Sequence, residues 1–315
     1  MAIGKDELIQ VGSRIYYLDS RCVNSTNVSG VYLVIGDGIT LIETATSLIA
    51  PHIVEAAVEI GFGAEEIRRA IVTHVHLDHA GGTGWLVKHL PHLQVHVHPR
   101  GLEHLHDPTR LIDSARAVYG GLDRITAIHG ETLPVPRENL VAVTDAELDV
   151  GGGVHLEIVA APGHASHHLC VFEPESGCLF SGEALGHNHP ESGVLQPAVA
   201  PPGFDFEASR ETIRKMRRLD PRTICFSQFG QRNDASFVIE EADRQLDRYH
   251  HLILTRLKQG LDTRQIVDDV ANLYLEGVLN ADSPGSEKHD QFVRSMLMSI
   301  VAGYETYFRR SGKLG

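Results

Sequence analysis

The stretch THVHLDHAGG, residues Thr73–Gly82, carries the strongest signal in the chain. It follows an apolar run and places three histidines and one aspartate within six residues. His74 and His76 are expected to project to one side, because side chains alternate along an extended chain. The turn that follows brings Asp78 and His79 to a neighbouring point. Imidazole nitrogens and carboxylate oxygens suit zinc, iron or manganese, so the stretch predicts a site for one or two metal ions.

The composition agrees with a metal site and excludes other classes. The chain has 315 residues, of which 20 are histidine and only 4 are cysteine. Histidine is the commonest protein ligand for metals. A formal net charge of −13 lacks the basic excess that binding to a phosphate backbone requires, so no nucleic-acid partner is expected. No run approaches the ~20 apolar residues that span a bilayer, and the N-terminus has no apolar signal core. We therefore expect no membrane association and a cytoplasmic location.

Most of the chain alternates between strand-like and helix-like segments. Short β-branched or aromatic runs predict strands at Arg14–Leu18, Val31–Ile35, Thr40–Glu43, Ala70–Thr73, Gln94–His98, Leu140–Val143, Val154–Ala160, Leu169–Phe172 and Cys178–Ser181. Apolar residues at helical spacing predict helices at Leu48–Ile60, Gly81–Leu90 and Thr109–Tyr119. The pattern indicates an α/β (α+β) domain over residues 1–232.

Beyond about residue 233 the strand signal stops. Three amphipathic segments follow, at Ala235–Gln259, Asp262–Leu275 and Glu287–Phe308. Residues 233–315 are therefore predicted to form a helical extension that acts as a lid, lines a pocket or forms a homodimer contact.

The histidine-rich stretch resembles the HxHxDH signature of the metallo-β-lactamase superfamily, whose fold is an αββα sandwich with metals at one edge. Pro162-Gly163-His164 resembles the P-G-H turn that supplies a further histidine ligand. Gly182-Glu183 stands where the family has Gly-Asp, and Gln228 stands where a last histidine closes the second metal site. The resemblance covers about residues 13–232.

The resemblance implies two adjacent metal positions. The first is a three-histidine site with an open coordination position, formed by His74, His76 and His164. The second rests on Asp78, His79 and Glu183.

The chain departs from the family pattern at three positions, and one of them, Gln228, weakens the second metal position. Glu183 is one methylene longer than aspartate and still reaches a metal. Gln228 offers only a neutral amide, so we expect it to act beside the metals or face the substrate rather than bind strongly. Glu43 closes a strand where the family has aspartate, and we expect it to support the metal loop without binding metal. One firmly held ion and a second of lower affinity follow from this pattern. His187 and His189 lie beyond Glu183 and receive no role.

The chemistry implied is hydrolysis of an ester, thioester or lactone by a metal-activated water whose proton Asp78 holds. Zinc is the expected cofactor, as one or two ions, with iron or manganese as alternatives, and the partner is a small-molecule substrate. Two other functions stay open. One is a mononuclear iron enzyme of the persulfide-dioxygenase type, which Gln228 leaves room for. The other is a metal-binding or sensing protein without catalysis.

Overall fold

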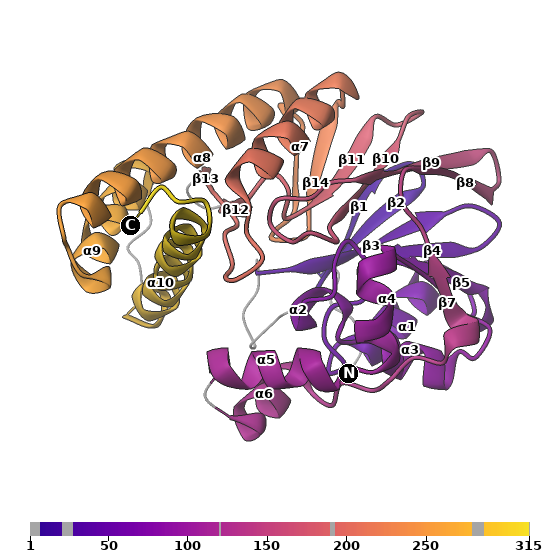
Figure 1. Cartoon of the computed structure of the whole chain (residues 1–315). Coiled ribbons are helices and arrows are strands. Elements are labelled where there is room, and N and C mark those ends of the chain that lie inside the picture. The colour runs from indigo at the N-terminus through magenta and orange to yellow at the C-terminus, as the bar shows by residue number, and fades with distance from the viewer. Residues whose placement is uncertain (1–6, 21–27, 120, 190–192, 279–286, 315) are drawn as a thin grey trace. The chain divides into compact units, whose positions relative to one another are not determined.

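A computed structural model describes residues 7–20, 28–119, 121–189, 193–278 and 287–314 (Figure 1). Contacts divide the chain into two compact units. The first comprises Met1–Ala160, His167–Gly182 and Pro221–Asn233, and the second Ala161–Ser166, Glu183–Asp220 and Asp234–Gly315. The second unit thus contains the predicted helical tail together with two earlier segments. The division into domains at residue 232 stays a prediction.

The first unit contains a seven-stranded sheet in the order β1-β2-β3-β4-β5-β6-β7. Pairing is antiparallel from β1 to β4 and parallel from β4 to β7. The strands are β1 (Leu8–Gly12), β2 (Ile15–Asp19), β3 (Gly30–Ile35), β4 (Ile39–Ile42), β5 (Ile67–Ile71), β6 (Gln94–Val97) and β7 (Leu140–Ala142). Most are apolar runs without alternation, as expected for strands covered on both faces.

Helices cover one face of this sheet (Figure 1). Helix α1 (Ala50–Glu59) contributes Ile53, α3 (Thr83–His89) contributes Leu86 and α4 (Pro99–His106) contributes Leu105 to a buried cluster with Leu41 and Val95 of the strands. The remaining short helices of this unit are η2 (Ala64–Glu66), α2 (Leu77–Ala80), α5 (Thr109–Tyr119), α6 (Leu122–His129) and η3 (Arg137–Asn139).

A second sheet of six strands packs against the other face. Its order is β15-β14-β11-β10-β9-β8, antiparallel except for the β11–β14 pair. Tyr32 and Ile42 of the first sheet share a buried cluster with Leu156, Val171 and Phe180 of the second, so the two sheets form a sandwich. The strands are β8 (Ala146–Gly151), β9 (Val154–Ala160), β10 (Leu169–Glu173), β11 (Cys178–Gly182), β14 (Thr223–Phe226) and β15 (Gln231–Arg232).

The second unit is mostly helical. It contains a two-stranded hairpin, β12 (His187–His189) and β13 (Val194–Gln196), and the helices α7 (Phe206–Arg218), α8 (Ala235–Lys258), α9 (Thr263–Val278) and α10 (Glu287–Arg310). The side chain of Asp205 caps α7 by accepting from the backbone N–H of Ala208. None of the described helices is long and apolar enough to cross a membrane.

The predicted fold class and the helical C-terminal region are confirmed. The helix expected over Gly81–Leu90 is present as α3, Thr83–His89, and a further short helix, α2, precedes it at Leu77–Ala80. The break between the two helices falls at Gly81-Gly82, where the backbone N–H of Gly82 bonds to the carbonyl of Ala45. A Cβ at Gly82 would lie 2.3 Å from the carbonyl oxygen of Thr44. This close approach of two backbones holds the histidine-rich loop beside the residues that follow β4.

Candidate metal centre

The histidine-rich stretch leaves β5 as a loop and enters α2. Backbone hydrogen bonds hold it on both sides: Leu169 N–H donates to the carbonyl of Thr73 at 2.7 Å, and Thr44 N–H donates to that of His79 at 2.8 Å. His74 and His79 are almost fully buried, whereas the Asp78 side chain is 27% exposed. The loop therefore presents fixed imidazoles beside one partly accessible carboxylate.

The Glu43 side chain holds this loop through hydrogen bonds. Glu43 lies directly after β4, is buried, and adopts a positive φ of 73°. Its Oε1 accepts from Thr73 Oγ1 at 2.5 Å and from Ser227 Oγ at 2.8 Å, and lies 3.1 Å from His79 Nδ1. Its Oε2 accepts from Thr73 N–H at 3.2 Å. Such a left-handed conformation in a buried glutamate is strained, and these bonds maintain it.

The contacts of Glu43 define the tautomer of His74. The hydroxyl proton of Thr73 goes to Glu43, so its oxygen accepts from His74 Nδ1–H at 3.0 Å. The Nε2 atom of His74 then carries a lone pair and faces His76 Nδ1 at 2.9 Å. A carboxylate that orients a histidine in this way is typical of metal sites.

His79 lies between two carboxylates. Its Nδ1–H donates to Glu43, and its Nε2 lies 3.3 Å from Asp78 Oδ2. Burial acts to lower the pKa of His79, but Asp78 and Glu43 raise it well above the usual value. The two carboxylates favour a positive charge at His79. A proton on Nε2 supplies that charge, and a metal ion bound to Nε2 instead of the proton would supply it equally well. The rings of His74 and His79 lie with their centroids 4.2 Å apart and offer ligand atoms within 4.8 Å of each other, so this pair of imidazoles fits a metal ion.

Gln228 contacts the same carboxylate. Its Nε2 donates to Asp78 Oδ2 at 2.8 Å and lies 3.5 Å from His79 Nε2. The amide thus supports Asp78 from the position where the family pattern has a histidine.

Two further histidines approach the loop from the segment before β10. His167 Nε2 accepts from Val75 N–H at 3.2 Å, and the ring of His168 stacks on His74 with centroids 5.1 Å apart. Gly182 ends β11 beside them with a positive φ of 55°, and a Cβ there would lie 2.5 Å from His168 Nε2. Glycine is therefore required at this point.

His164 and Glu183 belong to the second unit, where they contact each other. His164 Nδ1–H donates to the carbonyl of Ala198 at 3.1 Å, and Nε2 lies 2.7 Å from Glu183 Oε2. A neutral imidazole with its single N–H on Nδ1 has a lone pair on Nε2, so a proton or a metal ion is needed between Nε2 and the carboxylate oxygen. His187 Nε2 lies 2.5 Å from the other oxygen, Oε1. Burial acts to raise the pKa of Glu183, but His164 and His187 lower it well below the usual value.

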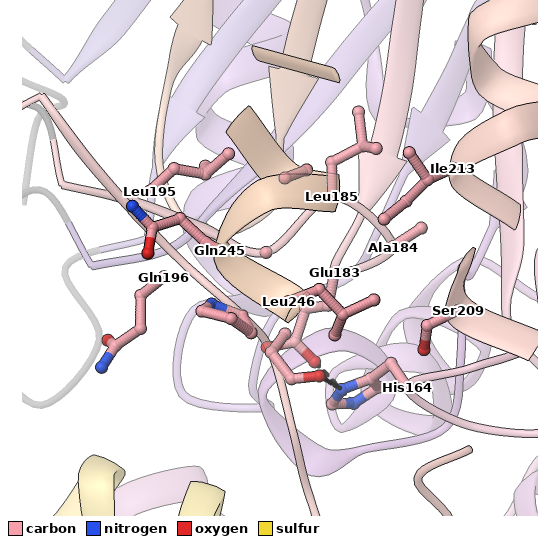
Figure 2. Close-up of a pocket in the computed structure, with 14 residues that line it drawn as sticks. His164, Glu183, Ala184, Leu185, Leu195, Gln196, Ser209, Ile213, Gln245 and Leu246 are labelled. Atoms are coloured by element: carbon pink, nitrogen blue, oxygen red, sulfur yellow. Dashed lines mark hydrogen bonds and ion pairs between the residues drawn. The ribbon is translucent and has the colours of Figure 1, made fainter. Parts of the chain in front are cut away.

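A pocket borders this pair within the second unit (Figure 2). Leu185, Leu195, Ile213 and Leu246 supply apolar wall, and Ser209 lies close to His164 in the view of Figure 2. An apolar cavity that meets a few convergent polar groups is typical of a small-molecule site.

Comparison with known proteins agrees with this geometry. Residues 26–228 match the family model described as the Metallo-beta-lactamase superfamily. The chain belongs to this superfamily. The metallo-beta-lactamase fold-containing protein ST1585 of Sulfurisphaera tokodaii is 23% identical to this chain over 223 residues. The matched residues cover 66% of this chain and 75% of that protein. The solved structure of ST1585 superimposes with a TM-score of 0.65 at 19% identity, covering 93% of this chain and 98% of that one.

Two superfamily relatives carry functional names. A hydroxyacylglutathione hydrolase of Legionella pneumophila is 29% identical over 119 residues, 38% of this chain and 34% of the relative. An atrochrysone carboxyl ACP thioesterase of Aspergillus fumigatus is 26% identical over 205 residues, 64% of this chain and 51% of the relative. The chain thus spans only a third to a half of the length of these two proteins.

The sequence predicted Glu43 as a support of the loop and Gln228 as a residue beside the metals, whereas the other supporting contacts were not predicted. In the first unit the structure brings together Asp78, His79 and Gln228, and His74 lies beside both His76 and His79. In the second it pairs His164 with Glu183. It also adds contacts of Thr73, Ser227 and His187, to which the sequence pattern assigned no role. The only signal in the sequence was the spacing of His187, four residues after Glu183 and next to a glycine.

Proposed function

We propose that this protein is a metal-dependent hydrolase that cleaves a carboxylic ester, thioester or lactone, with zinc as the expected ion. The observation that carries the proposal is the set of hydrogen bonds around Glu43. They engage Nδ1–H of His74 with Thr73 and Nδ1–H of His79 with Glu43, so the lone pair of each imidazole lies on Nε2, the atom that can bind a metal.

The ligand set proposed is His74, His76 and His164 for a first ion, with Asp78, His79 and Glu183 for a second of lower affinity. Two covalent links support including His164 and Glu183. His164 lies three residues before His167, which contacts Val75, and Glu183 directly follows Gly182. An extended chain spans at most about 3.3–3.6 Å per residue, so each link is short.

The roles of the chain's own residues follow from their contacts. Asp78 is partly exposed and is held by Gln228, so its carboxylate can orient a water and accept its proton. Glu43 is buried with both oxygens engaged, and we assign it to supporting the loop. A metal ion bound at these histidines supplies Lewis-acid chemistry, polarising a carbonyl and lowering the pKa of water toward about 7.

The names of the two relatives favour a thioester among the candidate substrates. One is called a hydroxyacylglutathione hydrolase and the other an ACP thioesterase, and both names describe an acyl group on sulfur. The pocket beside His164 and Glu183 has Leu195 and Leu246 in its wall, so the acyl part of a bound thioester would meet apolar side chains there.

The test is elemental analysis of the purified protein combined with a panel of esters, thioesters and lactones. We expect one to two zinc ions per chain and turnover of a thioester. Asp78→Asn should lower kcat by about 100-fold or more with bound metal retained at the three-histidine site, since it removes the proton acceptor. His76→Ala should remove the metal and the activity together. A single iron ion with oxygen uptake on a persulfide would overturn the proposal in favour of an oxygenase. Bound metal without turnover on any substrate would favour a sensing role.

A further inference from the structure

Glu183 is held at both of its oxygens, and one of the two partners has no assigned role. His164 faces Oε2 at 2.7 Å, while His187 faces Oε1 at 2.5 Å. The Glu183 carboxylate is 6% exposed and the His187 side chain 17% exposed. The two imidazoles therefore contact opposite oxygens of one buried carboxylate.

The backbone brings His187 to this place. Gly186 has a positive φ of 91°, and its N–H donates to the carbonyl of Glu183 at 3.1 Å. A Cβ at Gly186 would lie 2.3 Å from the carbonyl oxygen of Gln196. Glycine thus lets the chain turn back after Glu183, and β12 then pairs His187 opposite Gln196 of β13.

The far side of the His187 ring is also packed. Its Nδ1 lies 3.4 Å from the sulfur of Met296 in α10. The thioether is a weak hydrogen-bonding group, whereas the carboxylate is a strong acceptor. The Nε2 position accordingly carries the proton, and His187 donates to Glu183.

We propose that His187 is a positioning residue that binds Oε1 of Glu183 and so leaves Oε2, the oxygen next to His164, as the metal-ligand atom. This inference rests on the proposed metal-dependent function. The chemistry explains why such a partner is needed here. A glutamate has one more rotatable bond than the aspartate usual in the family, and its free carboxylate would lose more conformational entropy on binding a metal. A hydrogen bond to the second oxygen removes that freedom beforehand.

The experiment measures zinc affinity by competition with a chromophoric chelator. His187→Leu removes the donor, and His187→Gln keeps an N–H at a similar reach. His189→Gln is the matched control, because His189 lies on the same strand and its Nε2 contacts Gln196 Oε1 at 3.3 Å instead of Glu183. We expect His187→Leu to weaken zinc binding about 10- to 100-fold, and His187→Gln and the control to stay within about threefold of the unaltered protein.

A second readout is the visible spectrum of the cobalt-substituted protein, which should change for His187→Leu and not for His189→Gln. Far-ultraviolet circular dichroism shows whether each variant folds. If the leucine variant does not fold, the glutamine variant tests the donor instead, and a loss of affinity beyond threefold there overturns the proposal. Equal zinc affinity in His187→Leu and the unaltered protein overturns the positioning role and leaves the proposed function intact. Equal weakening in the leucine and glutamine variants also overturns it, since packing rather than the donor would then matter. If the unaltered protein binds no zinc or other divalent ion, both proposals fail together.

Discussion

Replacement of Glu43 by glutamine should weaken both the fold and the metal site. The carboxylate accepts from Thr73 Oγ1, Ser227 Oγ and Thr73 N–H and pairs with His79 Nδ1. An amide keeps one acceptor oxygen and turns an NH₂ donor toward groups that are themselves donors. His79 Nδ1 can accept a hydrogen bond from that NH₂ group only if its own proton moves to Nε2. A protonated Nε2 has no lone pair and can no longer bind a metal.

The size of the effect follows from these contacts. A hydrogen bond to a charged group contributes about 1.5–3 kcal/mol and a neutral one about 0.5–1.5 kcal/mol, so each retained bond weakens by about 1 kcal/mol. The new NH₂ group also faces another donor, so one hydrogen bond is lost in addition to the weakened ones. We therefore expect Glu43→Gln to lower the free energy of unfolding by about 2–4 kcal/mol in the absence of metal. Loss of a residue that orients histidine ligands typically weakens metal binding about 10- to 100-fold.

The assay combines urea denaturation of the metal-free protein with zinc competition. Glu173→Gln is the matched control, because Glu173 is also a buried carboxylate but accepts only from the backbone N–H groups of Glu175 and Ser176. The control should lose stability and keep its zinc affinity. If Glu43→Gln binds zinc as tightly as the unaltered protein, the argument that Glu43 sets the histidine tautomers is wrong.

Three further predictions concern Gln228, His250 and bound zinc. Gln228→His should raise the zinc content toward two ions per chain, because an imidazole would replace an amide that lies 2.8 Å from Asp78 and 3.5 Å from His79; unchanged stoichiometry contradicts this account. Burial, and to a lesser extent Lys313, lowers the pKa of His250 to about 4, so the unfolded chain takes up a proton there more readily than the folded chain. The neutral His250 imidazole therefore stabilises the folded chain at neutral pH, and this contribution is lost as pH falls from about 6.5 toward 4. The loss amounts to about 1–2 kcal/mol of unfolding free energy after solvent screening. His250→Gln should remove that part of the pH dependence in urea titrations. Chelation should destabilise the zinc-loaded protein by about 2.7 kcal/mol if zinc was present at a hundred times its Kd, and an unchanged melting temperature would argue against a site in the folded state.

Much of the fold could be predicted from the chain alone. The apolar runs that became β3, β4, β9 and β10 carry local signals of β-branched and aromatic residues that packing did not override. The helices of the C-terminal region likewise carry long amphipathic patterns. Short elements such as α2 were not predicted, because they are defined by tertiary contacts like the approach of Gly82 to Thr44.

The candidate site likewise contains residues that local spacing identified and contacts that depend on distant parts of the chain. The order and spacing of His74, His76, Asp78 and His79 identified the superfamily, since one short loop can present all four side chains whatever surrounds it. What Gln228 does could not be predicted, because its partner Asp78 lies 150 residues earlier in the chain.

By itself, the sequence determined the superfamily, the sandwich fold and the residue types that can bind a metal. Only the tertiary structure decided how those residues are held: Glu43 meets Thr73 and Ser227 across 30 and 184 residues of chain, and Gly186 turns His187 back onto Glu183. The physical reason is that a ligand's identity is a local property of the chain. The direction of its lone pair depends on hydrogen-bond partners that only folding brings together.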